Sequence, residues 1–370
     1  MPINKLQNNR KCILGHSIPV PSAVEAFLFI KYHIQMKKII LIPVLLLFIF
    51  CEKKEATHRF MQGEAFGTTY NIQFYSEKDI DFKKGLDSVI EAVNRSVSTY
   101  IPDSDISKVN QGDSTIVVDS IFKEVFEISK EVNKKTNGYF DPTIGVLRNA
   151  YGFGDVKPMK EIDSTTLDSL MKYVGFHKVK INNDGTISKE YPQIYFDFNA
   201  VAKGFGIDCL GRYLESKDVT DYLIELGGEI LAKGENIEKN QDWVVGIEAV
   251  DSELEDRSFE ATVKLKNVGM ASSGNYRKFR IDSATGKKYV HTLNPLTGSA
   301  EMSDVTSSTV IAPTCGVADA YATSFMALGI EKSKELLKNL PNVEAYLTFN
   351  DSLNQHQVFM TDGFKKRLGN

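Results

Sequence analysis

Residues 195–204 (YFDFNAVAKG) hold the side chains of this chain that are best placed to do chemistry. The apolar residues around Tyr195 and Phe196 predict a strand that ends on Asp197, and the apolar residues that follow at helical spacing predict a helix. Asp197 lies in the turn between them, and Asn199 is the expected helix cap. Free backbone N–H groups at a helix start attract an anion, and Lys203 adds an ammonium group. The stretch predicts a phosphate site, although an ordinary strand-to-helix connection with a solvated lysine has the same pattern.

Two further oxygen ligands are predicted on a helix over residues 315–328. Asp319 and Thr323 are four residues apart and therefore lie on one face of that helix. A carboxylate and a hydroxyl suit Mg²⁺, which keeps several waters and binds substrate phosphates. Spacing alone favours a simpler explanation, in which the helix dipole favours the aspartate and the threonine has no special role.

The elements that must position these residues follow from the hydrophobic pattern. Amphipathic helices are predicted over residues 82–100 and 122–136, and the second half of residues 60–75 alternates like an edge strand. After the central turn the chain is predicted to be mostly sheet. The strand-like runs there lie at residues 222–231, 243–248, 261–265, 268–274 and 306–312.

Two other regions are candidates for carrying a base or for binding a flat ligand. Residues 277–281 and 288–293 are predicted to form a hairpin, which places His291 at one end of it. Residues 139–145 and 151–154 are rich in aromatic residues and glycine and show no core periodicity. Their rings could stack on a flat ligand, or they could simply cover the core.

Composition places the chain among ordinary globular proteins. It has 370 residues, of which 42% are hydrophobic and 25% charged, and its net charge is −4. The basic residues form no stripe, which argues against a nucleic-acid partner, although a small phosphorylated ligand needs only one local site. The four cysteines suggest no disulfide framework, and Cys209 and Cys315 lie in apolar helical contexts where a buried thiol is expected.

The N-terminal region has the pattern of an export signal. Residues 36–38 (MKK) precede a short apolar run over residues 39–50, and Cys51 follows it. The run is too short to span a membrane comfortably. A cysteine at its end resembles a bacterial lipoprotein signal, in which Cys51 is lipidated and becomes the mature N-terminus. Bulky residues at 48–50 occupy positions where small residues are usual, so an uncleaved anchor is the alternative.

These features divide the chain into four segments. Residues 1–35 fit no targeting pattern and are interpreted as an upstream extension that is not part of the fold. Residues 36–51 form the signal segment, and residues 52–59 form a polar tether. Residues 60–370 are then the globular domain.

Eight motifs in a fixed order strongly resemble the ApbE family, and the resemblance runs from about Phe60 nearly to the C-terminus. The motifs lie at residues 66–70 (FGTTY), 98–107 (STYIPDSDIS), 140–145 (FDPTIG) with 151–154 (YGFG), 197–204 (DFNAVAKG), 226–228 (LGG), 272–276 (SSGNY), 291–298 (HTLNPLTG) and 318–323 (ADAYAT). The resemblance implies an α+β, ApbE-type (T-fold-like) domain. Such a domain has two lobes, mixed and antiparallel sheets, packed helices and a flavin bound between the lobes.

The resemblance to this family implies an FAD:protein FMN transferase. Such an enzyme uses Mg²⁺ to transfer FMN from FAD to a threonine or serine hydroxyl of an acceptor protein, and it releases AMP. The acceptor is expected to be a subunit of a membrane redox complex with a motif of the type Asp-Gly/Ser-x-Ser/Thr-x-x-Ser/Thr. The enzyme is expected to be exported, anchored to a bacterial membrane by a lipid at Cys51, and to face the periplasm. Two alternatives are an FAD pyrophosphatase that yields FMN and AMP and a lipoprotein that only binds flavin.

The resemblance also implies roles for individual residues. The residues expected to bind FAD are Phe66, Tyr100, Tyr139, Phe140, Asp141, Asp197, Lys203 and Leu293. The metal ligands would be the Ala200 carbonyl, Asp319 and Thr323. His291 is the candidate base for the acceptor hydroxyl, with Asp319 or a metal-bound water as alternatives. A hairpin histidine with a purely structural hydrogen bond is the simpler explanation of His291.

Three residues depart from the pattern of the family. Phe66 replaces a methionine that packs against the flavin, Tyr151 replaces a tryptophan, and Asn294 replaces an aspartate. These departures affect how the flavin packs more than they affect the chemistry. The expected chemistry is electrostatic, because Mg²⁺, Lys203 and the helix start would neutralise charge as the bond between the two phosphates breaks.

Overall fold

The computed structural model describes residues 56–159, 162–248, 259–274, 279–281, 286, 288–300 and 302–369. The chain divides into two compact units, residues 1–55 and 56–370, and every described residue belongs to the second unit. The expected upstream extension, the signal segment with Cys51 and residues 52–55 of the expected tether lie outside the described residues. Within the described part of the chain, no helix is long and apolar enough to cross a membrane.

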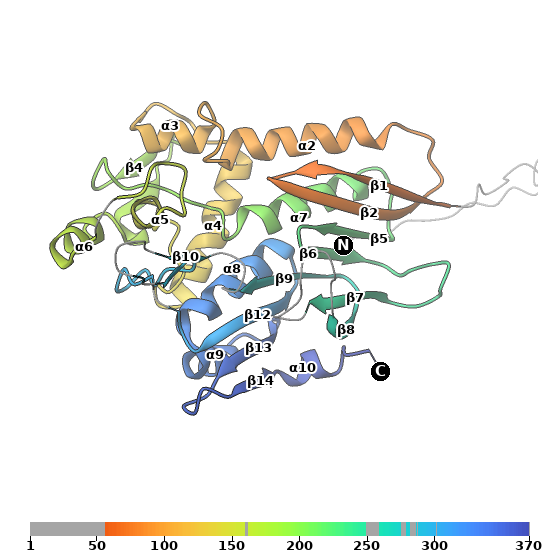
Figure 1. The fold of residues 1–370 in the computed structure, drawn as a ribbon. Helices are drawn as coiled ribbons and strands as arrows, with labels where there is room; N and C mark the ends of the chain where they lie inside the picture. The colour runs from red at the N-terminus through yellow and green to blue at the C-terminus, as the bar shows by residue number, and fades with distance from the viewer. Residues whose placement is uncertain are drawn as a thin grey trace, which may run out of the picture. The chain divides into compact units, whose positions relative to one another are not determined.

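An eight-stranded sheet forms the centre of the described unit (Figure 1), and all of its neighbouring strands run antiparallel. In sheet order its strands are β1 (Thr57–Ala65), β2 (Thr68–Ser76), β5 (Tyr222–Leu226), β6 (Glu229–Lys233), β9 (Val268–Gly274), β12 (Val305–Ala312), β13 (Glu344–Asn350) and β14 (His356–Met360). Because β1 begins at Thr57, the fold begins before Phe60, where the domain was expected to start.

The position of β2 in this sheet corrects one prediction. The segment was expected to be an edge strand, but β2 pairs with β1 on one side and with β5 on the other. The edge position belongs to β1, whose residues are mostly exposed or half-buried. Tyr70, Ile72 and Phe74 alternate along β2 and are all buried in the core beneath the helices, which is why this strand lies inside the sheet.

Helices cover one face of the sheet in two layers. In the inner layer, α7 (Ala202–Glu215) packs on β5 and β6, while α8 (Cys315–Leu328) packs on β9, β12 and α7. In the outer layer, α2 (Phe82–Val97) packs on α7, and α4 (Ser120–Lys135) packs on α8. The helix α9 (Ile330–Leu337) contacts α8 and β13. The helices predicted around residues 82–100, 122–136 and 315–328 are thus confirmed.

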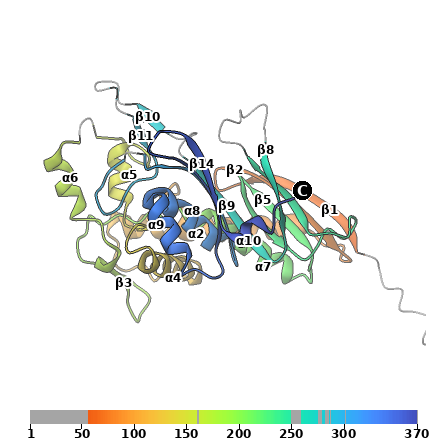
Figure 2. The ribbon, with the colours of Figure 1, turned by 90° about the horizontal axis from the view of Figure 1, so that it is seen from below.

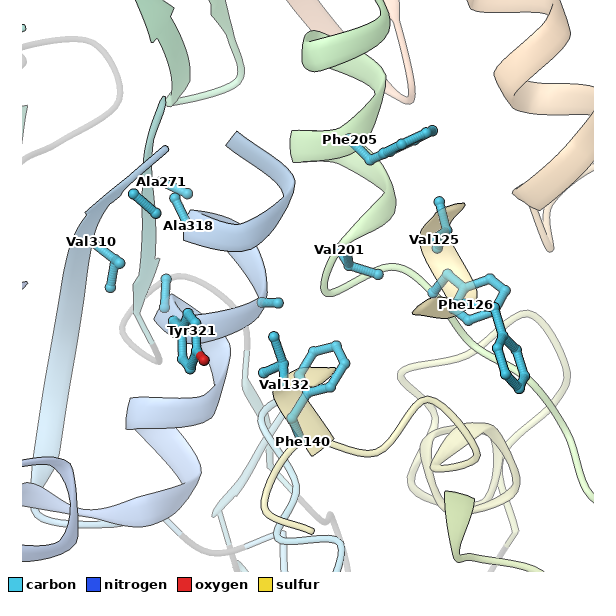
Figure 3. Close-up of a cluster of buried hydrophobic side chains, with 14 of the residues drawn as sticks. Val125, Phe126, Val132, Phe140, Val201, Phe205, Ala271, Val310, Ala318 and Tyr321 are labelled. Carbon is cyan, nitrogen blue, oxygen red and sulfur yellow. The ribbon is translucent and has the colours of Figure 1, made fainter. Parts of the chain in front are cut away.

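The largest part of the core lies where α8 meets its neighbours, and Figure 3 shows these side chains. Ala318 and Tyr321 of α8 lie between the strands that carry Ala271 and Val310 and a second group of side chains, which consists of Val201 just before α7, Phe205 of α7, and Val125 and Phe126 of α4. All of these residues are buried. The helix that carries Asp319 is therefore held by packing on both of its sides, which fixes where its polar residues point.

Smaller elements cover the other face and the end of the sheet, and Figure 2 shows α9 and β8 on opposite sides of β9. The other face is covered by β7 (Trp243–Glu248), β8 (Phe259–Leu265) and α10 (Asp362–Lys365), through a core that includes Trp243, Leu265 and Phe364. The remaining elements are α3 (Asp105–Gln111), α5 (Gly145–Tyr151), α6 (Ser164–Met171), η1 (Phe176–Lys178), β3 (Val179–Ile181), β4 (Ile187–Lys189), β10 (Phe279–Ile281) and β11 (Lys288–Val290). The predicted hairpin is confirmed, because β10 and β11 pair antiparallel.

The strand predicted to end on Asp197 is wrong. Residues 194–198 form only an isolated bridge between Tyr195 and Ile144, and no regular strand. The backbone groups of Phe196 bond instead to a side chain: the amide nitrogen of Asn110 donates to its carbonyl at 2.9 Å, and its N–H donates to the Asn110 side-chain oxygen at 2.7 Å. The apolar pattern still has its cause, because Phe196 and Phe198 are buried against α4.

Candidate active site

The turn before α7 is organised by Asp197. Its Oδ1 accepts the N–H of Asn199 at 2.8 Å, and its Oδ2 accepts a hydrogen bond from the guanidinium of Arg148 in α5. The start of α7 is at Ala202, and Val201 caps it without a side-chain hydrogen bond. The prediction that Asn199 caps this helix is therefore wrong, because the Asn199 backbone is used to close the turn on Asp197.

A buried charged cluster lies beside the start of α7 and contains Lys203, Glu229 and Asp319. The Lys203 Nζ lies 2.5 Å from Oε2 of Glu229, the first residue of β6. The N–H of Gly204, the next residue of α7, donates to Oδ2 of Asp319 at 3.1 Å. Glu229 and Asp319 are buried, and Lys203 is half-buried with a side-chain exposure of 29%. The fold thus brings Lys203 and Asp319 together, as the phosphate and metal hypotheses require.

The start of α7 offers fewer free N–H groups than the sequence pattern indicated. The Ala202 N–H donates to the Phe198 carbonyl at 2.7 Å, and the Gly204 N–H is bound by Asp319. An anion at this place would therefore be attracted mainly by the Lys203 ammonium and by the positive end of the helix dipole. Gly204 permits the contact, because a Cβ there would lie 2.4 Å from the Cys315 carbonyl oxygen.

The charges in this cluster shift one another's ionisation. Burial raises the pKa of Glu229 to about 8, with the Lys203 ammonium opposing the shift and the Asp319 charge adding to it. Burial also raises the pKa of Asp319, against the opposing effects of Lys203 and of the Gly204 N–H. Burial acts to lower the pKa of Lys203, but the two carboxylates outweigh it, and its pKa is raised. Clusters of this kind are common at functional sites.

The residues expected to hold Mg²⁺ fit a cation of that type. Asp319 and Thr323 lie one turn apart on α8, and the Thr323 Oγ1 lies 3.3 Å from the Ser273 Oγ of β9. Ala200 is half-buried just before α7. All of these donors are oxygen atoms, which Mg²⁺ prefers.

The charge of the cluster supports the same fit. The described contacts give Asp319 and Glu229 a single ammonium group, that of Lys203, so a divalent cation would offset the excess negative charge. The described residues contain no group of three or more His, Cys, Asp or Glu side chains that could hold a metal by themselves. A cation here would therefore depend on oxygen atoms of the substrate or of water in addition to protein ligands.

Two of the expected flavin contacts lie in turns. Phe66 and Gly67 form the tight turn between β1 and β2, both with positive φ (51° and 77°). The Phe66 ring covers Gly206 of α7, where a Cβ would lie 2.5 Å from its Cε2. This places Phe66 against the first turns of the helix that carries Lys203. Tyr100 lies in the turn after α2 and is 64% exposed, so its ring is open to contact by a ligand.

The expected flavin segment at residues 139–141 is largely used by the protein itself. Phe140 is buried in the core, and Tyr139 packs partly against it. The carboxylate of Asp141 is buried and accepts hydrogen bonds from the Thr143 N–H, the Thr143 hydroxyl and the Phe176 N–H, at 2.6–2.8 Å. Asp141 therefore joins the loop after α4 to η1 in this structure.

His291 and Leu293 follow β11, and Leu293 lies beside α5. Leu293 is buried in an apolar cluster with Leu147 and Tyr151 of α5. His291 is half-buried. The hydroxyl of Tyr151 donates to the Gly298 carbonyl at 3.0 Å, which ties α5 to the turn after His291. Because Arg148 of the same helix binds Asp197, α5 connects the segment with His291 to the turn before α7.

Sequence reasoning missed Glu229 and Arg148. Glu229 directly follows the motif at residues 226–228, and it alternates with Leu231 on the face of β6 that meets α7. A charged residue at a buried strand position was therefore a signal in the sequence. Arg148 had no such signal, because only the folded chain brings α5 to Asp197, a sequence separation of 49 residues.

The fold and the cluster define an α+β domain with a buried group of charged side chains where two helices meet a sheet. Comparison with known proteins gives its family. The family model described as "ApbE family" matches residues 66–347, and the chain belongs to this family.

Similar proteins agree with this assignment. The FAD:protein FMN transferase of Haemophilus influenzae is 34% identical over 307 residues, which cover 80% of this chain and 87% of that protein. The FAD:protein FMN transferase of Escherichia coli K12 is 27% identical and covers 82% of this chain. The solved structure of the flavin transferase ApbE from Vibrio cholerae has a TM-score of 0.73 and 29% identity, and it covers 85% of this chain and all of that one. These likenesses confirm the predicted ApbE-type α+β fold.

Proposed function

We propose that this protein transfers FMN from FAD to a hydroxyl group of an acceptor protein and releases AMP. The observation that carries the proposal is the cluster of Lys203, Glu229 and Asp319, buried where α7, α8 and β6 meet. Family membership and the names of the similar proteins support the reaction. The acceptor would be a subunit of a membrane redox complex that offers a threonine or serine.

In this reaction the acceptor oxygen forms a bond to the FMN phosphorus, and the bond to the AMP phosphate breaks. The hydroxyl proton must leave the acceptor oxygen, and His291 is the proposed base. Lys203 would contact the FAD phosphates, because its side chain is partly exposed at the start of α7. Phe66 and Tyr100 would bind the flavin ring.

The Ala200 carbonyl, Asp319 and Thr323 would hold Mg²⁺. When bound, this ion supplies positive charge to the phosphate oxygens as the bond between the phosphates breaks. The chain prepares the place for it by burying Asp319 and by holding that carboxylate with the Gly204 N–H. Lys203 then neutralises part of the negative charge that remains.

We also propose that the protein is exported and anchored through a lipid on Cys51, facing the periplasm of a bacterial cell. The support is the sequence pattern of residues 36–51 alone. A lipid anchor would hold the enzyme at the same membrane as its acceptor, which raises the local concentration of each for the other.

The experiment that tests the reaction is incubation of the protein with FAD, Mg²⁺ and an acceptor that carries the expected motif. A transferase yields a fluorescent acceptor band and AMP in equal amounts. Free FMN without a labelled acceptor would show a pyrophosphatase instead. Unchanged FAD, with FAD binding retained, would show a flavin-binding protein without catalysis. An acceptor with alanine in place of its motif threonine is the matched control and should stay unlabelled.

A further inference from the structure

Asp208 is a charged residue of α7 to which the proposed reaction gives no role. Its side chain reaches the start of α8. Its Oδ1 accepts the Cys315 N–H at 2.8 Å, and its Oδ2 accepts the Gly316 N–H, also at 2.8 Å. Both carboxylate oxygens are thus used to cap a different helix from the one that carries them.

A second contact joins the same two helices with the roles reversed, so that α8 supplies the carboxylate and α7 the N–H group. Asp319 of α8 accepts the Gly204 N–H at the start of α7. Residues 204 and 319 are therefore paired at one point, and residues 208 and 315 are paired one turn away, so the two helices lie antiparallel at this contact. Each helix start receives a carboxylate from the other helix, which suits the positive end of both helix dipoles.

The backbones approach closely between these two contacts, which makes the position of α8 sensitive to them. A Cβ at Gly316 would lie 3.2 Å from the Phe205 Cα. On the sheet side, a Cβ at Gly269 of β9 would lie 2.3 Å from the Cys315 nitrogen. The start of α8 is thus enclosed by α7 and β9, and Asp208 provides a polar contact between this start and α7.

We propose that Asp208 is a positioning residue: by holding the first two N–H groups of α8, it fixes Asp319 opposite Gly204 and Lys203. The geometry separates this role from ordinary helix capping. The cap on α8 itself is Thr314, whose hydroxyl oxygen accepts the Val317 N–H at 3.4 Å. Thr314 is exposed and belongs to α8, so it stabilises the helix without joining it to α7.

The inference rests on the proposed function only because Asp319 is there assigned to Mg²⁺ and Lys203 to the FAD phosphates. Its test compares Asp208→Asn with Thr314→Ala as a matched control. Asn keeps the size of the side chain but replaces one oxygen by an NH₂ group that cannot accept an N–H. Both variants weaken the start of α8, and only the first weakens its contact with α7.

The first measurement is amide hydrogen exchange in metal-free protein, read by mass spectrometry on the peptide that contains Gly204. We expect Asp208→Asn to speed exchange of this amide, although Gly204 is not the residue that Asp208 binds. We expect Thr314→Ala to leave it unchanged. The melting temperature should fall for both variants, by roughly 3–10 °C for Asp208→Asn, because a charged hydrogen bond is lost.

The second measurement is FMN transfer as a function of Mg²⁺ concentration. Asp208→Asn should need about tenfold more Mg²⁺ for half-maximal transfer, as is usual when support around a metal ligand is removed. Thr314→Ala should keep the wild-type Mg²⁺ dependence. Wild-type exchange at Gly204 together with wild-type Mg²⁺ dependence in a destabilised Asp208→Asn would overturn the proposal and leave Asp208 as a cap alone.

Two further results are distinguished by this design. If Asp208→Asn does not fold, Asp208→Glu takes its place, because it keeps the charge and shifts the contact by one methylene. The exchange of the Gly204 amide and the Mg²⁺ dependence of transfer in that variant then test the proposal. If the wild-type protein transfers no FMN, the proposed function has failed, while the exchange comparison between the two variants still decides whether Asp208 positions the two helices.

Discussion

Asp319→Asn separates the proposed metal role from a structural role, because the two roles predict different changes in the free energy of unfolding and in FMN transfer. Asn has the shape of Asp, and its side-chain oxygen can still accept the Gly204 N–H, which now bonds to Oδ2 of Asp319. The substitution removes the negative charge. If this charge stabilises the fold, its loss lowers the free energy of unfolding. If it binds a cation, the free energy of unfolding does not fall, but FMN transfer is lost.

The direction of the stability change follows from the pKa. Burial raises the pKa of Asp319, so the folded state disfavours the ionised form relative to the unfolded chain. At pH 7 the charge therefore destabilises the metal-free fold, and a neutral side chain of the same shape should relieve this cost. We expect the free energy of unfolding without metal to stay unchanged or to rise by about 1 kcal/mol.

The expected change in transfer is much larger. A bound metal ion contributes several kcal/mol of charge stabilisation in the transition state. Each 1.36 kcal/mol is a factor of ten in rate, so transfer at fixed Mg²⁺ should fall by about 10²-fold or more. Raising Mg²⁺ should restore part of the activity. Thr323→Val should show a weaker effect of the same kind, because a neutral hydroxyl contributes less than a carboxylate.

Two assays on the same protein preparations check this prediction: urea unfolding in the presence of a chelator, and FMN transfer over a Mg²⁺ titration. Asp119→Asn is the control, because Asp119 caps α4 through the Phe122 N–H at 2.8 Å and has no part in the cluster. It should lose some stability and keep full transfer. An Asp319→Asn protein with normal turnover and normal Mg²⁺ dependence would refute the metal role of this residue.

Three other predictions concern FAD binding, anchoring and pH dependence. Lys203→Met should weaken FAD binding by about 10- to 100-fold, since a charged hydrogen bond to phosphate is worth about 1.5–3 kcal/mol, and unchanged quenching of FAD fluorescence would place the phosphates elsewhere. Cys51→Ser should move the protein from the membrane fraction to the soluble fraction, and equal retention on immunoblots would reject lipidation at this residue. Burial raises the pKa of Asp208 from 3.8 to about 6. Between these pH values the folded protein binds this proton and the unfolded chain does not, so the free energy of unfolding rises as the pH falls through that range. Wild type should therefore gain about 1 kcal/mol over Asp208→Asn between pH 7 and pH 5 in urea unfolding, and a constant difference would contradict the raised pKa.

Local patterns in the sequence were enough to predict the four longest helices and the hairpin, but not the shorter helices α3, α5, α6, α9 and α10. The helix over Cys315–Leu328 has the predicted bounds, because its apolar residues and its cap lie within the same stretch of chain. The order of eight short motifs was enough to indicate the family, and comparison with known proteins confirmed it. Asp319 and Thr323 were predicted to share a face for the same local reason: residues four apart in a helix always do.

Contacts between distant parts of the chain decided the rest. The apolar residues around Phe196 predict a strand, but the backbone of Phe196 forms its hydrogen bonds with the side chain of Asn110, 86 residues away. Gly204 and Asp319 meet across 115 residues, and Asp208 reaches Cys315 across 107. The sequence by itself determined the four longest helices, α2, α4, α7 and α8, and the family to which the chain belongs. Only the packing of α7 against α8 and β6 decided that the Lys203 ammonium lies close to the carboxylates of Glu229 and Asp319. Burial and electrostatic interaction between charges depend on contacts between elements, and no local sequence pattern predicts them.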